Sequence, residues 1–265
     1  MPEHLILTLE APMVAFGGEA IDNRGVVRDF PALSMLTGLI ANALGWDRTE
    51  GARLDALQAR IDFAAARLRP GHRRQEYQTA RLFEREAGWT TRGRPEGRAP
   101  SPSFAWDARW EAERGERAKS LTHQRQRDFD ADACTVVALT LTSSHDGPGL
   151  PEVEEALQRP ERPLFIGRKP CLPSGPICGA EPVTAPSPPA ALAEALARQG
   201  LVAKVRLQWS PAPQDRPGQS HKLGAMRLHT ERRHRIADIR RHVAGVHGGS
   251  REVAEGVLIL DEQPA

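Results

Sequence analysis

The sequence lacks several features that would place it in a membrane, outside the cell or among disulfide-stapled proteins. Three cysteines in 265 residues cannot all pair, and a chain of this length can bury a core without disulfides. No stretch approaches the roughly 18 to 20 apolar residues that span a bilayer, and no basic region followed by an apolar run marks a secretory signal. We therefore expect a cytoplasmic protein with reduced thiols and no contact with a membrane.

The common catalytic signatures are also missing. The chain contains no GxxxxGK[ST] motif, no GxGxxG after a strand, no HExxH and no GxSxG. Cys171 and Cys178 stand seven residues apart, which is not a usual zinc spacing, and two thiols cannot fill a four-ligand site. We expect neither a metal nor a cofactor, and the sequence favours binding over catalysis.

Positive charge is concentrated in two blocks, although the net charge is only +2. Residues 67–127 hold 15 basic and 8 acidic side chains, and residues 204–251 hold 11 basic and 3 acidic ones. The rest of the chain is acidic. Such segregation is typical of a surface that meets a polyanion, and nucleic acid is the obvious candidate.

The apolar pattern predicts two β-α-β units separated by a long insertion. Residues 4–10 alternate like a half-buried strand, residues 31–46 have helical spacing, residues 53–58 suggest a short helix, and residues 61–68 read as a strand. After the insertion come a strand at 134–142, a helix at 151–158, a strand at either 164–166 or 201–209, an Ala-rich helix ending near Gly200, and a closing strand at 256–260. This order matches the ferredoxin-like split βαβ pattern, an α+β fold.

The insertion, residues 70–127, has no periodicity and mixes aromatic residues with arginines. Connections of this length are usually functional or disordered. Trp89 and Trp106 could stack on bases while neighbouring arginines follow a phosphate backbone. The alternative is an arm whose tryptophans pack against another protein.

Two glycine-containing segments could bring backbone N–H groups and cations to a phosphate. In Phe165–Cys171 (FIGRKPC), Gly167 precedes Arg168 and Lys169. The segment after the first strand carries Arg24 and Arg28 among glycines. Either segment could also be no more than a turn.

Five segments, in order, resemble the CasD family, the type I-E branch of the CRISPR-associated RAMP proteins. Leu5–Gly17 (LILTLEAPMVAFG) is similar to the family's opening strand and its continuation, and Phe30–Trp46 (FPALSMLTGLIANALGW) to its Phe-Pro helix. Glu76–Ala80 (EYQTA) and Gln126–Ala133 (QRDFDADA) are similar to the segments before and after its thumb. Phe165–Cys171 is similar to its Y-L-G-R-[KR]-x-C loop. The last loop and the Phe-Pro helix are the specific motifs.

The resemblance implies a ferredoxin-like (RRM-like) palm with a long inserted thumb and a small C-terminal extension. We expect the palm at residues 1–71 and 128–210, the thumb at 72–127 and a basic extension at 211–265. The family's role would be non-catalytic: to grip the 5′ handle of the crRNA in a Cascade complex for antiviral defence. Such a subunit caps the CasC backbone, contacts the large subunit CasA, and meets target DNA only through the complex.

The expected RNA contacts follow from the family motifs and from the basic segments. They are Arg24, Arg28, Ser34, Tyr77, Arg81, Trp89, Trp106, Arg125, Arg127, Gly167, Arg168 and Lys169. Two other functions stay open. One is a metal-independent endoribonuclease that processes the crRNA precursor, with Tyr77, His72 or Lys169 as acid and base. The other is a protein-docking module whose basic blocks bind an acidic neighbour.

Overall fold

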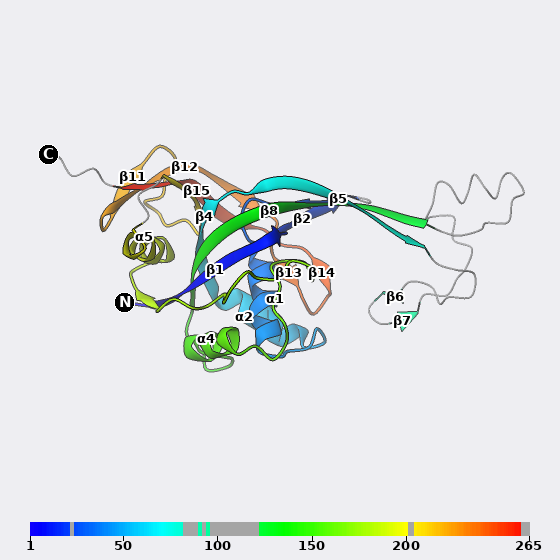
Figure 1. Cartoon of the computed structure of the whole chain (residues 1–265). Coiled ribbons are helices and arrows are strands. Elements are labelled where there is room, and N and C mark those ends of the chain that lie inside the picture. Colours follow the sequence, from blue (N-terminus) through cyan, green and yellow to red (C-terminus); the bar gives the residue numbers. More distant parts are fainter. Residues whose placement is uncertain (22–23, 82–89, 92–93, 96–121, 201–203, 261–265) are drawn as a thin grey trace, which may run out of the picture. The chain divides into compact units, whose positions relative to one another are not determined.

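The computed structural model describes residues 1–21, 24–81, 90–91, 94–95, 122–200 and 204–260 (Figure 1). The chain divides into two compact units. The first comprises residues 1–19, 27–74 and 129–265, and the second comprises residues 20–26 and 75–128. Each unit is described below by itself.

The first unit is built on a large, mainly antiparallel sheet. Its strands follow the order β11-β12-β15-β10-β4-β8-β1-β9. The strands are β1 (Glu3–Val14), β4 (Ile61–Arg69), β8 (Thr122–Leu141), β9 (Val183–Thr184), β10 (Val205–Trp209), β11 (Ser220–Leu223), β12 (Met226–Ile236) and β15 (Arg251–Leu260). A small hairpin, β13 (Arg240–Arg241) with β14 (Val246–His247), lies outside this sheet.

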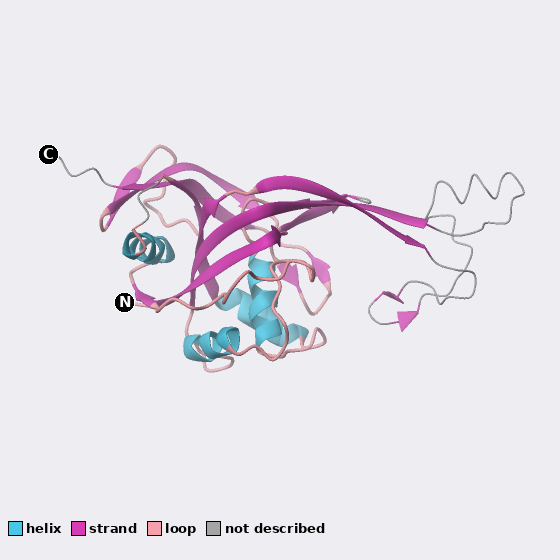
Figure 2. Ribbon diagram, viewed as in Figure 1, coloured by secondary structure: helices cyan, strands magenta, loops and turns pink. Residues whose placement is uncertain are grey.

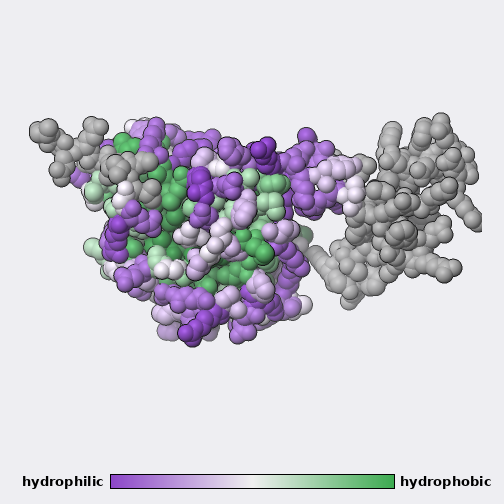
Figure 3. Space-filling model, viewed as in Figure 1, coloured by the Kyte–Doolittle hydropathy of each residue, from purple (hydrophilic) through white to green (hydrophobic). Residues whose placement is uncertain are grey.

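Helices cover the two faces of this sheet unequally (Figure 2). One face packs against α1 (Leu33–Ala43), α2 (Gly51–Arg60) and α4 (Leu150–Gln158), and the other packs against α5 (Pro188–Arg198). The face turned to the viewer in Figure 3 shows hydrophobic residues between margins of hydrophilic ones. Within the described part of the chain, no helix is both long and apolar enough to cross a bilayer.

Strand alternation explains why the central strands are apolar on both sides. In β1, Leu7 faces the core beneath α1 and Ile6 faces the core beneath α5, and both are at most 1% exposed. Successive side chains of a strand point to opposite faces, so a strand covered on both faces needs apolar residues at every position. Leu36 of α1 and Leu192 of α5 complete the two cores.

The second unit contains the end of β2 (Gly17–Ile21), most of β3 (Arg24–Val27), most of β5 (His72–Arg81) and the first part of β8. β3 pairs with β2 and, in parallel, with β8, and β5 also pairs with β8. Two short strands, β6 (Thr90–Thr91) and β7 (Arg94–Pro95), form a separate antiparallel pair.

The predicted elements largely match those observed. Helix α1 lies within the predicted 31–46, α2 extends the predicted 53–58 by two residues at each end, and β4 agrees with the predicted 61–68. Of the two alternatives for the later strand, the one at 164–166 is wrong, because those residues form a loop, and β10 is the strand. The segment 211–265 contributes β11, β12 and β15 to the main sheet. The fold is thus a mixed α and β fold around a large sheet.

An aspartate from the C-terminal segment caps the start of α1. The N-cap residue Ala32 has no side-chain oxygen, and the Asp238 carboxylate accepts the Leu33 N–H at 3.0 Å instead. The Asp238 carbonyl accepts the Ser34 N–H, also at 3.0 Å. Arg251 balances the buried charge, with its Nε 3.0 and 3.1 Å from the two carboxylate oxygens. This arrangement satisfies N–H groups that a helix start otherwise leaves without partners.

The three cysteines are free and buried. Burial is the main cause that raises the pKa of the Cys178 thiol to about 11, and the nearby Glu154 carboxylate raises it further. Since the thiolate is the reactive form, native Cys178 should react slowly with electrophiles.

We expect Asp238→Ala to lower the free energy of unfolding by about 3 to 5 kcal/mol, because it leaves the Arg251 charge buried without its partner and uncaps α1. Urea denaturation followed by circular dichroism measures the change. Glu194→Ala is the matched control, since it breaks a half-exposed pair with Arg198 on α5 and should cost about 1 kcal/mol or less. Equal losses in the two variants would contradict the role assigned to Asp238.

Cys178 gives a pH-dependent prediction. The folded thiol has a pKa of about 11, whereas the pKa of the thiol in the unfolded chain is about 9.0. The stability from the neutral buried thiol is therefore present below about pH 9 and lost as the pH rises towards 11. Iodoacetamide at pH 9 should therefore modify Cys178 in urea but spare it in the native protein, as read by peptide mass spectrometry. Fast modification of the native thiol would show that the site is open.

Candidate nucleic-acid interface

The loop of residues 165–171, which contains Gly167, is held against the end of β1 by backbone contacts. Ala15 donates its N–H to the Ile166 carbonyl at 3.2 Å, and Ile166 donates to the Cys171 carbonyl at 2.8 Å. Gly167 has φ +91°, and a Cβ built there would lie 1.8 Å from the Ala15 carbonyl oxygen. Only glycine fits this close approach of two backbones.

Arg168 and Lys169 follow Gly167 directly and lie on this fixed turn. Cys171 donates its N–H to the Arg168 carbonyl at 2.9 Å, which closes the loop over Lys169. The Arg168 side chain is half-buried and Lys169 is exposed. The loop therefore carries an exposed ammonium group on a rigid backbone, as a phosphate contact requires.

Arg28 converges on the same end of β1. Its N–H donates to the Phe16 carbonyl at 2.7 Å, so Arg28 and Gly167 both contact the Ala15–Phe16 backbone. The guanidinium Nη2 donates to the Ala237 carbonyl at 2.6 Å. Its Nε is buried and has no hydrogen-bond partner among the described residues. Ser34 lies close by in the first turn of α1, half-buried.

A network of arginines and aspartates surrounds Asp29, the residue after Arg28, and sequence reasoning missed it. Asp29 is 2.9 Å from Arg67 and 3.5 Å from both Arg73 and Arg206. Asp130 is 2.7 Å from Arg73 and 3.4 Å from Arg67. The partners come from four separate segments, so no local motif reveals them. These arginines are held by carboxylates and are less available to RNA than the exposed Lys169.

In the second unit, the structure describes three of the predicted contacts in detail. Arg24 lies opposite Gln126 in the parallel β3–β8 pair, and its Nε donates to the Gln126 side chain at 3.2 Å. Arg127 Nε donates to the Gln78 side chain, also at 3.2 Å. Tyr77, on β5, is 57% exposed. An exposed ring beside polar side chains suits stacking on an unpaired base.

The remaining predicted contacts are described less fully. Arg125 is exposed on β8. Arg81 ends β5, and its side chain lies outside the described residues. Trp89 and Trp106 also lie outside the described residues. Among the residues that are described, no group of three or more His, Cys, Asp or Glu side chains could hold a metal ion.

Gly167→Ala should disrupt the loop, since the added Cβ would collide with the Ala15 carbonyl and the φ value disfavours any side chain. We expect a loss of at least about 2 kcal/mol in unfolding free energy. Gly175→Ala is the control, because no atom lies within 4 Å of its Cβ position. Thermal melting of both variants checks this, and equal melting temperatures would refute the tight contact.

Comparison with known proteins gives the family. Residues 4–253 match the sequence model of the family described as CRISPR-associated protein (Cas_Cas5). The CRISPR system Cascade subunit CasD of Escherichia coli (strain K12) is 30% identical over 173 residues, which cover 64% of this chain and 67% of that protein.

Solved structures agree on the fold. A chain of a CRISPR RNA-guided surveillance complex superposes with a TM-score of 0.62 at 18% identity, covering 97% of this chain and 91% of the other. A structure described as a Cas protein gives a TM-score of 0.56 at 17% identity, covering 98% of this chain and 100% of the other. With a family match over nearly its whole length, the chain belongs to the Cas5 family of CRISPR-associated proteins.

Proposed function

We propose that this chain is a non-catalytic, RNA-binding subunit of a type I-E Cascade complex that grips the 5′ handle of the crRNA. Membership of the Cas5 family and the similarity to a Cascade subunit support this proposal. Two backbone contacts carry it: Gly167 packs closely on Ala15, and the Arg28 N–H donates to the Phe16 carbonyl. Together they bring Arg168, Lys169 and Arg28 to one end of β1.

Such a cluster suits the backbone of a single strand. Cations neutralise phosphates and release counterions, which supplies most of the affinity without reading sequence. Protein contacts to RNA favour single strands with unstacked bases, and an RNA-guided complex leaves recognition of the target to base pairing. A handle-binding subunit therefore needs rigid cationic loops and exposed rings, and it needs no catalytic group.

The proposal also assigns each unit a part in the complex. The first unit would be a ferredoxin-like palm, and the second unit would belong to the thumb. In the assembled complex the chain would cap the CasC backbone and contact CasA, and it would meet target DNA only through the complex. The mixed α and β fold and the extensive sheet are compatible with such a palm.

Arg168→Ala/Lys169→Ala should weaken binding of handle RNA about tenfold at 0.15 M salt, roughly the loss expected for two phosphate contacts. The slope of log affinity against log salt should become shallower by about 1.4, since each single-strand contact contributes about 0.7. Fluorescence anisotropy with labelled handle RNA measures both. Arg159→Ala/Lys204→Ala removes the same charge from two exposed positions outside the loop and should change neither value. An equal loss of affinity in both double variants would show that the RNA senses only the net charge of the chain, which would contradict a contact at the loop.

Incubation of the purified chain with repeat RNA in EDTA tests the non-catalytic part. The RNA should remain intact. Cleavage would favour the endoribonuclease, and alanine substitution of Tyr77, His72 and Lys169 would then identify the acid and base. If handle and scrambled RNA bind equally poorly, and no RNA fragment survives RNase treatment of the assembled complex, the protein-docking function replaces the proposal.

A further inference from the structure

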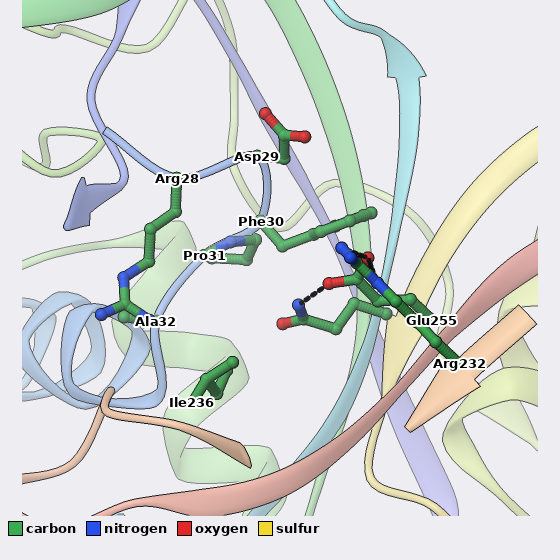
Figure 4. A pocket seen from close by; sticks show the side chains of 9 residues that line it. Arg28, Asp29, Phe30, Pro31, Ala32, Arg232, Ile236 and Glu255 are labelled. Atoms are coloured by element: carbon green, nitrogen blue, oxygen red, sulfur yellow. Dashed lines mark hydrogen bonds and ion pairs between the residues drawn. The ribbon is translucent and has the colours of Figure 1, made fainter. Parts of the chain in front are cut away.

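A half-open cavity lies in the first unit, between the start of α1 and the sheet (Figure 4). Its volume is about 180 Å³. The segment from Arg28 to Ala32 forms one side, and residues of β10, β12 and β15 form the other. Arg28 lies at one end, while Arg232 and Glu255 lie at the other.

Three strands place a row of polar side chains along this cavity. Gln208 of β10 and Arg232 of β12 are both register partners of Glu255 on β15. Gln208 Nε2 donates to the Glu255 carboxylate at 2.9 Å, and Arg232 donates to it through Nη2 at 2.6 Å and Nε at 3.1 Å. Glu255 and Gln208 are each 5% exposed, whereas the Arg232 side chain is exposed, so the row runs from the buried sheet out to the surface.

The charges of the lining make the cavity a poor phosphate site. The formal charges of the lining residues sum to zero, and its two arginines already have partners. Arg232 pairs with Glu255, and Arg28 Nη2 donates to the Ala237 carbonyl. The first N–H groups of α1, which would otherwise attract an anion, already donate to Asp238. An uncharged ligand with polar edges is therefore the better match.

The lining offers hydrogen-bonding groups of both kinds and a flat apolar wall. Arg28 Nε is a buried donor without a partner, and Gln208 Oε1 accepts no bond from a described residue. The rings of Phe30 and Pro31 and the side chain of Ile236 form apolar parts of the lining. An apolar cavity of about 150 Å³ can hold benzene, so this cavity suits one planar ring system of similar size.

We propose that this cavity receives one unstacked nucleobase of the bound RNA. The inference rests on the proposed RNA-binding function and deepens it. The base would lie against Phe30 and Pro31, with its polar edge towards Arg28 and Gln208. Uncharged bases have both donors and acceptors on their edges, and proteins that bind single-stranded RNA commonly take up splayed bases in this way.

An abasic scan of the handle RNA tests the proposal with the unchanged chain. A set of RNAs, each lacking one base but keeping every phosphate, is compared by fluorescence anisotropy. One position should lose about tenfold in affinity, as expected for one stacked and hydrogen-bonded base. At that position 2-aminopurine should be shielded from quenching by acrylamide. A quencher-accessible base, or a scan without any sensitive position, would overturn the inference.

A cavity-filling variant assigns the sensitive base to this cavity. Ile236→Trp should weaken binding of intact RNA about tenfold, and it should abolish the further loss caused by the abasic position. Val246→Trp adds the same ring at a position that is 49% exposed on β14 and should bind like the wild type. Melting curves confirm that both variants fold.

The outcomes separate this inference from the proposed function. If the Ile236→Trp chain keeps the full abasic effect, the base binds elsewhere, and the cavity inference fails while RNA binding stands. If the wild-type chain does not prefer handle over scrambled RNA, both fail. If Ile236→Trp does not fold, Ala32→Leu, which fills the cavity from the α1 side, takes its place in the same comparison.

Discussion

The buried carboxylate of Asp238 at the start of α1 joins two parts of the sequence on which the candidate site depends. It accepts the Leu33 N–H and is neutralised by Arg251 of β15. The neighbouring carbonyl of Ala237 accepts from Arg28. The chain between Arg28 and Leu33 is therefore tied at both ends to the C-terminal segment. The chain between Arg28 and Leu33 forms one wall of the cavity. Its position against β10, β12 and β15 follows from these few bonds.

The cations of this chain fall into two groups with different roles. Arg67, Arg73 and Arg206 are held around Asp29 and Asp130, where they fix neighbouring strands and loops. Lys169 instead stands exposed on a loop fixed by backbone contacts. Clustered charge in the sequence overstates the number of cations available to a ligand, because some of them form ion pairs within the fold. The geometry of the loop, rather than the total charge, selects the residues that can meet a phosphate.

Sequence reasoning located the elements that have strong local patterns. It missed the contacts and the cavity that form between strands far apart in the sequence. The helical spacing of its apolar residues predicted α1, and the structure buries two of them, Leu36 and Ile40, completely. The Gly167 loop was identified from its composition, although its contact with Ala15 was not. The cavity could not be predicted, because its polar row depends on strand register and on a bulge between Thr230 and Arg232. The strand β12 was not predicted either, because its many arginines and histidines obscure the apolar positions Met226 and Leu228 that face the core.

The place of β15 in the sheet has a consequence for biogenesis. This strand, residues 251–260, lies between β10 and β12, and it supplies Glu255 and Arg251. A ribosome delivers it after every other strand described here, so β12 and β10 stay separate until residues 251–260 have been made. Neither the cap of α1 nor the cavity can form on a nascent chain that still lacks these residues. Folding of this region is therefore post-translational with respect to β15, and a chain cut short before residue 251 would lack both the inner strand and the polar row of the cavity.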